Sequence, residues 1–161
     1  MRTKLALLLL PLLAPCAFGA DLFDTVAPQP LSQLWLTTGF YSYHFQRDKD
    51  LNDRNPGLGL EYRYSTQATA MAGRFYNSDR RYSNYIGWQY QPWAIGPVRL
   101  GAVVAGFDGY PKMRSGGWFL AAIPVASVEG ERVGVNIGFV PSYKDRLYGA
   151  VSFQLRIKLA D

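Results

Sequence analysis

The 161-residue chain has one cysteine and one histidine, and only 18% of its residues are charged. Outside the first twenty residues, no apolar run approaches the roughly 18–20 residues of a membrane-spanning helix. A helical membrane protein is therefore excluded, whereas a β-barrel membrane protein is not. The net charge of +5 is a mild excess and the basic residues are scattered along the chain, which gives no indication of nucleic-acid binding.

Residues 1–19 have the pattern of a secretory signal peptide. Arg2 and Lys4 give the positive start, residues 5–13 are apolar, and residues 17–19 form a small-x-small cleavage site. We expect cleavage after Gly19, which leaves a single domain over residues 20–161. Cys16 falls inside the signal, so the mature chain then has no disulfide and no thiolate metal site. Lipidation at Cys16 is the alternative, although the preceding proline does not suit a lipobox.

Aromatic residues are abundant, with 4 Trp, 11 Tyr and 9 Phe, and 16 Gly and 10 Pro divide the chain into short segments. Several segments alternate strictly. In the last one, Val151, Phe153 and Leu155 alternate with Ser152 and Gln154. No segment has the period of an amphipathic helix, so we expect little helix. The pattern predicts eight strands, near residues 34–45, 57–65, 68–77, 82–92, 97–107, 117–128, 132–141 and 146–158.

Eight alternating strands of about 10–11 residues behind an export signal are typical of an outer-membrane protein. We therefore predict an all-β fold, an eight-stranded antiparallel up-and-down transmembrane β-barrel in the bacterial outer membrane. Aromatic residues near the predicted strand ends would form the interfacial girdles; these are Trp35, Tyr43, Tyr64, Tyr76, Tyr82, Tyr90, Trp93, Phe107 and Trp118. A soluble secreted sandwich or a lipocalin-like barrel is the alternative. The chain ends in Leu159-Ala160-Asp161, whereas such membrane barrels typically end on an aromatic residue.

Polar residues that could carry chemistry follow two predicted strands that run in the same direction. His44 ends the first strand, and Asn77-Ser78-Asp79 follows the third. Alternate strands are about 10 Å apart, and loop residues can close that gap. A histidine general base beside a serine hydroxyl is an arrangement for acyl transfer. The alternative is that residues 77–79 form only a turn, for which each is suited.

The order and spacing of several segments resemble the outer-membrane lipid A palmitoyltransferases, in a divergent proteobacterial branch. The resemblance covers about residues 35–157, and it is carried by Ser42-Tyr43-His44, Pro56-Gly57-Leu58-Gly59-Leu60, Met71-Ala72-Gly73-Arg74-Phe75-Tyr76-Asn77-Ser78, Gly87-Trp88, Ile123-Pro124-Val125-Ala126-Ser127-Val128 and Phe139-Val140-Pro141. The resemblance implies an eight-stranded barrel that moves a palmitoyl chain from a phospholipid donor to a lipid A acceptor. We further expect a monomer in the membrane, with no metal and no organic cofactor.

Prolines and small residues fit a slot for a hydrocarbon chain. Pro124 and Pro141 sit inside adjacent predicted strands and Pro56 begins another, although proline cannot donate to a β ladder. In the resembled enzymes such gaps are lateral openings for acyl chains; bulges that help curvature are the alternative. Small residues would leave room inside, namely Gly101, Ala105, Gly117, Ala121, Gly134, Gly138 and Gly149. A polar floor could be formed by Glu61, Arg63, Arg74, Gln89, Arg156 and Lys158.

The loop at residues 46–55 supplies Arg47, Lys49 and Arg54 as candidate ligands for lipid phosphate groups. In the proposed site His44 is the general base, Ser78 the nucleophile or a hydroxyl-positioning residue, and Asn77 or Asp79 the orienter.

Two features depart from the resembled family. Asn77 stands where the family has an aspartate, so either Asp79 substitutes, or His44 lacks a carboxylate, or the site is inactive. The segment before the first strand also lacks the family's amphipathic clamp helix.

Two further alternatives stay open. A non-catalytic lipid-binding or structural barrel predicts that His44 and Ser78 lie more than about 10 Å apart. A transporter of a small solute such as glycerol-3-phosphate is disfavoured, because an eight-stranded barrel has a narrow interior.

Overall fold

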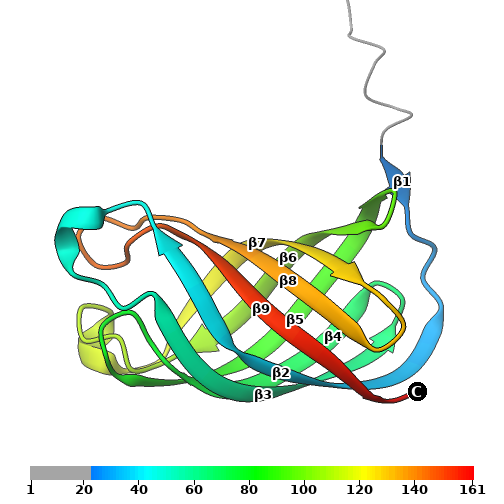
Figure 1. Cartoon of the computed structure of the whole chain (residues 1–161), viewed down its shortest axis with the longest axis horizontal. Coiled ribbons are helices and arrows are strands. Elements are labelled where there is room, and N and C mark those ends of the chain that lie inside the picture. Colours follow the sequence, from blue (N-terminus) through cyan, green and yellow to red (C-terminus); the bar gives the residue numbers. More distant parts are fainter. Residues whose placement is uncertain (1–22) are drawn as a thin grey trace, which may run out of the picture.

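The computed structural model describes residues 23–161, which form a closed antiparallel β-barrel (Figure 1). The strands are β1 (Asp24–Thr25), β2 (Pro30–His44), β3 (Arg54–Ser65), β4 (Ala68–Tyr76), β5 (Tyr82–Ile95), β6 (Val98–Phe107), β7 (Phe119–Glu129), β8 (Val133–Val140) and β9 (Ala150–Ala160). Strands β2 to β9 pair in chain order, and β9 pairs back with β2. The predicted all-β, eight-stranded up-and-down barrel is therefore confirmed. The predicted signal peptide and Cys16 lie outside the described residues.

The predicted strands all form, and their ends differ by a few residues. The last strand begins at Ala150 rather than near residue 146, because residues 143–147 form a turn. In that turn Tyr143 bridges to Leu147 and Lys144 has a φ of 49°. Helix is limited to two short 3₁₀ turns in the described residues, η1 (Arg47–Lys49) and η2 (Arg114–Gly116), as the sequence predicts.

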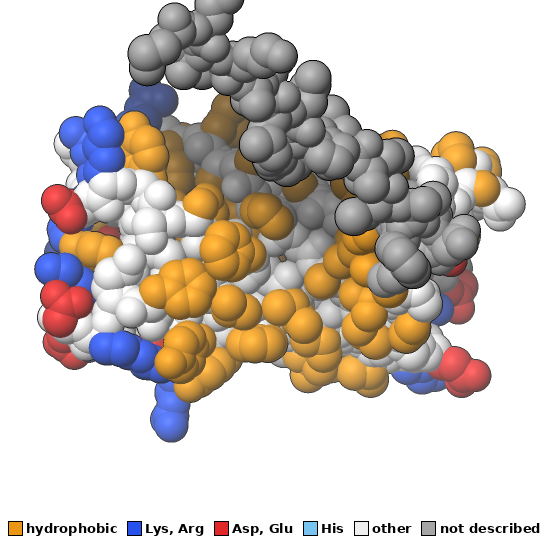
Figure 2. Space-filling view, turned by 90° about the horizontal axis from the view of Figure 1, so that it is seen from above, with side chains coloured by type: hydrophobic (Ala, Val, Ile, Leu, Met, Phe, Trp, Pro, Cys, Tyr) orange, Lys and Arg blue, Asp and Glu red, His pale blue; other side chains and the backbone are white. Residues whose placement is uncertain are grey.

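The two faces of the barrel wall differ in chemistry. Outward-facing apolar side chains are strongly exposed, with Leu120 at 80% and Leu58 at 64%, whereas Glu61 and Arg156 are buried inside. Figure 2 shows apolar side chains along the middle of the visible face and charged ones toward its two ends. An apolar band around an eight-stranded barrel is compatible with an outer-membrane protein. Residues 23–161 contain no helix long and apolar enough to cross a membrane.

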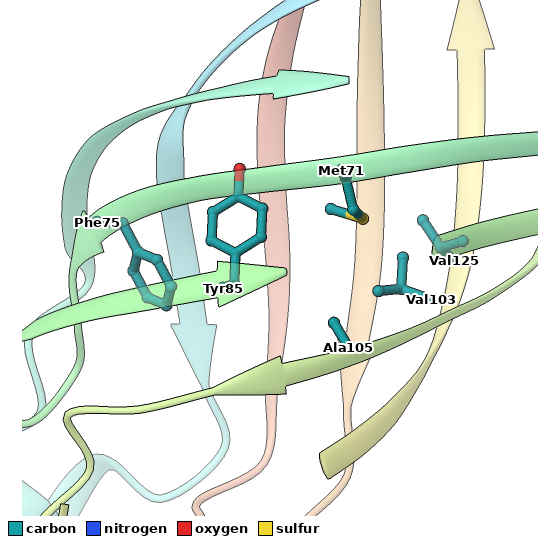
Figure 3. Close-up of a cluster of buried hydrophobic side chains, with 6 residues drawn as sticks. All are labelled: Met71, Phe75, Tyr85, Val103, Ala105 and Val125. Atoms are coloured by element: carbon teal, nitrogen blue, oxygen red, sulfur yellow. The ribbon is translucent and has the colours of Figure 1, made fainter. Parts of the chain in front are cut away.

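The barrel interior has an apolar half and a polar half. The apolar half lies toward the rim that carries His44, and Figure 3 shows its core, formed by Met71, Phe75, Tyr85, Val103, Ala105 and Val125. The polar half lies toward the end where the C-terminus emerges in Figure 1. Its buried members are Glu61, Arg63, Gln89, Gln91, Ser127, Asn136, Gln154 and Arg156. Of the six residues expected in a polar floor, Arg74 points outward instead, with its guanidinium over the ring of Tyr82.

Most of the predicted girdle residues point outward, including Tyr43, Tyr64, Tyr82, Tyr90, Trp93 and Trp118. The prediction is wrong for Trp35 and Phe107. Trp35 is 1% exposed inside the barrel, with the guanidinium of Arg156 4.5 Å from its ring centroid. Phe107 packs on Phe119 at 6.1 Å between ring centroids.

The segment before β2 crosses the end of the barrel that lies opposite His44. The Val26 N–H donates to the Pro92 carbonyl oxygen over 2.8 Å, and the Gln29 N–H donates to Thr66 Oγ over 2.9 Å. Asp24 pairs with Ala94 of β5. The segment is thus tied to β5 and to the turn between β3 and β4.

Candidate active site

His44 ends β2 with its imidazole buried between a carboxylate and a hydroxyl. Its Nδ1 lies 2.8 Å from Asp53 Oδ1, and its Nε2 lies 2.8 Å from Ser78 Oγ. A carboxylate only accepts hydrogen bonds, so Nδ1 carries the ring proton and donates it to Asp53. The Nε2 atom then accepts from the Ser78 hydroxyl. The three side chains have the connectivity of a Ser-His-Asp triad.

Asp53 is the residue that the sequence reasoning missed. The sequence predicts Asn77 or Asp79 as the orienter, whereas the hydrogen bonds to the imidazole come from Asp53 and Ser78. Asp53 lies immediately before β3, at the end of the charged loop. Its second carboxylate oxygen, Oδ2, accepts from Arg47 Nη1 over 3.3 Å.

Backbone hydrogen bonds between two loops bring Asp53 to the site. The Asn52 N–H donates to the Ser78 carbonyl oxygen over 3.0 Å, and Asn52 Nδ2 donates to the Asn77 carbonyl oxygen over 3.2 Å. The Ser42 N–H donates to the Asp53 carbonyl oxygen over 2.8 Å. The loop after β2 is therefore fastened both to its own strand and to the loop after β4, next to Ser78.

Asn77 shapes the loop that presents Ser78. Its Oδ1 accepts from the N–H groups of Asp79 and Arg81 over 2.9 and 3.0 Å. Its Nδ2 donates to Ser83 Oγ over 2.8 Å and to the Gly109 carbonyl oxygen over 2.9 Å. An ionised aspartate has no donor for these last two contacts. The asparagine that departs from the resembled family is thus the side chain that this loop requires.

Asp79 lies beside the site without orienting His44. It lines the interior cavity, where burial raises the pKa of its carboxyl, against the opposing charges of Lys112 and His44. Tyr110 lines the same cavity, and burial together with the charge of Asp79 raises the pKa of its phenol. The phenol therefore keeps its proton and is a hydrogen-bond donor in the lining of this cavity.

A cavity of about 120 Å³ opens beneath the triad. Its rim includes His44, Ser78 and Asp79, and its walls are mainly apolar, formed by Phe40, Met71, Phe75, Val103, Phe107, Phe119, Ala121, Ile123, Val125 and Val140. Of the small residues expected to leave room, Ala121 and Gly138 line it. Gln89, Asn136 and Gln154 lie at its deep end. The cavity is thus an apolar slot that ends on polar groups.

The polar groups at the deep end form one connected network. Ser127 Oγ donates to Asn136 Oδ1 over 2.6 Å, and Asn136 Nδ2 donates to Glu61 Oε1 over 3.1 Å. Glu61 lies 2.7 Å from the guanidinium of Arg156, which also pairs with Glu129. Glu129 in turn lies 2.5 Å from Arg63. The buried charges are paired, which is a condition for their burial.

The backbone ladder between β7 and β8 covers only part of the two strands. Their ladder runs from Glu129↔Gly134 to Val125↔Gly138 and stops there, while β7 continues to Phe119. Pro124 is the first residue of β7 beyond the last pair, and Pro141 follows the end of β8. Two of the three predicted gate prolines therefore adjoin the unpaired stretch between β7 and β8.

Pro56 lies elsewhere, beside a bulge between β2 and β3. The register shifts there between Thr38↔Leu58 and Phe40↔Asn55. Gly39 has no room for a side chain at this point, since a Cβ would lie 1.9 Å from the Asn55 carbonyl oxygen. A groove on the outside of the wall follows the bulge and is lined by Arg54 and Pro56.

Two of the three expected phosphate ligands form ion pairs with aspartates of their own loop. Arg47 pairs with Asp53 and stacks on Tyr43, with 3.9 Å from its guanidinium carbon to the ring centroid. Lys49 pairs with Asp48 over 3.2 Å. Arg54 is exposed beside the outer groove and forms no ion pair within residues 23–161. The structure does not bring these three cations together as one site.

No protein-family model matches the chain, and no curated protein matches its sequence. The fold and the site define the class of protein, which is an eight-stranded antiparallel β-barrel with a Ser-His-Asp arrangement at one rim. Among residues 23–161, no cluster of three His, Cys, Asp or Glu side chains is placed to hold a metal ion.

Proposed function

We propose that the protein is an outer-membrane acyltransferase that takes an acyl chain from a phospholipid and passes it to lipid A. The observation that carries the proposal is the Asp53-His44-Ser78 arrangement, with both contacts to the imidazole at 2.8 Å. A non-catalytic barrel gives no reason for a histidine and a serine from different loops to meet at hydrogen-bond distance. The resemblance described above supplies palmitate and lipid A as the acyl chain and the acceptor.

Membrane insertion is supported by the outer surface of the barrel. Large apolar side chains such as Leu58, Ile86 and Leu120 are more than 60% exposed. Exposing a continuous apolar band to water is unfavourable, whereas hydrocarbon accommodates it. Tyrosine and tryptophan near the strand ends suit the interface between acyl chains and headgroups.

The first half of the proposed reaction forms an acyl-enzyme. Ser78 Oγ attacks the ester carbonyl carbon of the phospholipid while His44 Nε2 takes the hydroxyl proton. The carboxylate of Asp53 holds the imidazole and stabilises its positive charge. The tetrahedral intermediate then collapses, the ester C–O bond breaks, and the lysophospholipid leaves with the proton from His44. The acyl chain remains esterified to Ser78.

The second half transfers the chain to the acceptor. His44 takes the proton of a lipid A hydroxyl, and that oxygen attacks the acyl-serine carbonyl. The bond to Ser78 Oγ breaks and the serine recovers its proton from His44. The apolar slot beneath Ser78 gives the acyl chain a place during both steps, and the unpaired stretch between β7 and β8 gives it a route from the surrounding lipid.

The proposal is tested by mass spectrometry of lipid A from cells with and without the gene, grown under conditions that induce it. We expect an added acyl chain when the gene is present and its loss in a Ser78→Ala, His44→Ala double variant that still assembles in the membrane. Identical lipid A acylation in both strains would refute lipid A as the acceptor. Full activity of the double variant would refute the assigned residues.

A further inference from the structure

Two cations lie on the rim loops that adjoin β7 and β8. Lys112 belongs to the loop at residues 108–118, which leads into β7, and Arg146 belongs to the loop at residues 141–149, which follows β8. Both side chains are exposed. Arg146 lines the cavity together with Ser78. One cation is therefore carried by the loop that enters β7 and the other by the loop that leaves β8.

A hydrogen bond joins these two loops and brings the two cations near each other. Lys112 Nζ donates to Tyr148 Oη over 2.8 Å and lies 4.8 Å from the centroid of the same ring. Tyr148 is two residues from Arg146. The hydrogen bond to Tyr148 and the negative charges of Asp79 and Asp145 raise the pKa of Lys112, so it stays charged.

Three other cations of this rim form ion pairs. Arg47 pairs with Asp53, Lys49 with Asp48, and Arg80 with Asp50 over 3.1 Å. Lys112 and Arg146 take part in no ion pair within residues 23–161, and the same holds for Arg54, Arg81, Arg114 and Lys144 of this rim. Only Arg146 among these six lines the cavity, and Lys112 is bonded to Tyr148, which also lines it. Two unpaired cations that converge on a catalytic mouth favour an anionic ligand.

We infer that Lys112 and Arg146 bind the phosphodiester group of the lipid that donates the acyl chain. The inference rests on the proposed function, because it takes the acyl ester to lie at Ser78. A chain that has entered between β7 and β8 with its ester at Ser78 carries its glycerol phosphate a few bonds further out, at the level of these two loops. Lysine and arginine both bind phosphate oxygens by charge-assisted hydrogen bonds.

The experiment compares two donors that differ only in the phosphate headgroup. The full chain in detergent micelles is assayed with dipalmitoyl phosphatidylglycerol and with dipalmitoylglycerol, and the ratio of their kcat/KM values is measured. In the Lys112→Ala, Arg146→Ala double variant we expect this ratio to fall about tenfold or more, as the loss of charged contacts to phosphate predicts. The Lys112→Arg, Arg146→Lys variant, which retains both charges, should keep most of the wild-type ratio of kcat/KM values. Arg132→Ala, which removes an exposed cation from the opposite end, should leave it unchanged.

An unchanged ratio in the double variant would overturn the inference. So would a rise in the KM for lipid A with an unchanged ratio, because the phosphate would then belong to the acceptor. If the wild-type chain transfers no acyl group, the proposed function fails separately, and binding of the same two lipids is measured by native mass spectrometry. A preference for phosphatidylglycerol that the double variant loses still supports the phosphate site, and an equal preference in both proteins contradicts it.

Discussion

The Nε2 atom of His44 lies 2.8 Å from Ser78 Oγ, although 34 residues separate them in the chain. Strands β2 and β4 run in the same direction, so their ends meet at one rim of the barrel. The loops after these strands then close the remaining distance, with Asn52 bonded to the backbone of the Ser78 loop. The contact is a consequence of the up-and-down topology and of two specific loops.

Asp53→Asn should lower kcat by on the order of 10²–10⁴-fold, because the amide can stabilise the wrong imidazole tautomer and cannot stabilise the imidazolium. The measurement is the rate of palmitoyl release from phospholipid by the purified variant. Asp79→Asn is the matched control and should change kcat far less, since Asp79 does not bond the imidazole. A larger loss of kcat in Asp79→Asn than in Asp53→Asn would show that the orienter is wrongly assigned.

Asn77→Asp, which restores the residue of the resembled family, should be unfavourable in this chain. Its carboxylate would face the Gly109 carbonyl oxygen and leave Ser83 Oγ without its donor. We expect the free energy of unfolding to fall by about 1–3 kcal/mol at neutral pH. The loss should shrink at low pH, where a protonated aspartate can donate again. Urea unfolding in lipid vesicles at several pH values measures this, and a variant as stable as wild type at neutral pH would contradict it.

Asp79 should make the stability of the barrel depend on pH. Burial raises the pKa of its carboxyl above the ordinary value of 3.8 in the folded protein. At pH values between 3.8 and the raised pKa of the folded state, the folded protein binds more protons than the unfolded chain. The free energy of unfolding therefore falls as pH rises through this range, and it stays reduced at higher pH.

The test of this dependence is Asp79→Asn. The variant should match wild type below about pH 3, where the carboxyl is protonated in both states. It should be the more stable protein above the raised pKa. Chemical unfolding followed by tryptophan fluorescence over this pH range gives the comparison, and parallel profiles for the two proteins would exclude a raised pKa.

Ala121→Phe should block the slot and spare the triad. Ala121 lines the cavity, whereas its neighbour Ala122 is exposed on the outside of the same strand. With a palmitoyl ester we expect Ala121→Phe to lose most of its activity and Ala122→Phe to retain it. With a butyryl ester both variants should remain active, which also shows that both are folded. Equal effects of the two substitutions on the palmitoyl ester would mean that the chain does not occupy this cavity.

The strands could be predicted from the sequence because apolar and polar residues alternate over most of their length. Alternation fails as a guide near Gly39, where bulges put Thr37 and Phe40 on the same inner side of β2. A slip of one residue moves every side chain to the other face. Trp35 is assigned to the outer girdle only because it lies near a strand end, which does not say to which face its side chain points; it shares the inner face with Thr37.

His44 and Ser78 could be predicted as a pair from strand direction alone, but Asp53 could not. The loop after β2 contains Asp48, Asp50 and Asp53, and their spacing gives no preference among them. Asp53, rather than Asp48 or Asp50, reaches His44 because tertiary hydrogen bonds join Asn52 to the Ser78 loop. The same loop pairs Arg47 and Lys49 with its own aspartates, so their charges alone could not indicate a phosphate site.

The most direct test of the account is covalent labelling of Ser78 by a long-chain alkyl fluorophosphonate, followed by peptide mass spectrometry of the purified full chain. We expect one label per chain on Ser78, formed at least tenfold more slowly in His44→Ala and Asp53→Asn, as is typical of a base-activated serine. No label on Ser78, or a labelling rate that these two substitutions leave unchanged, would contradict it.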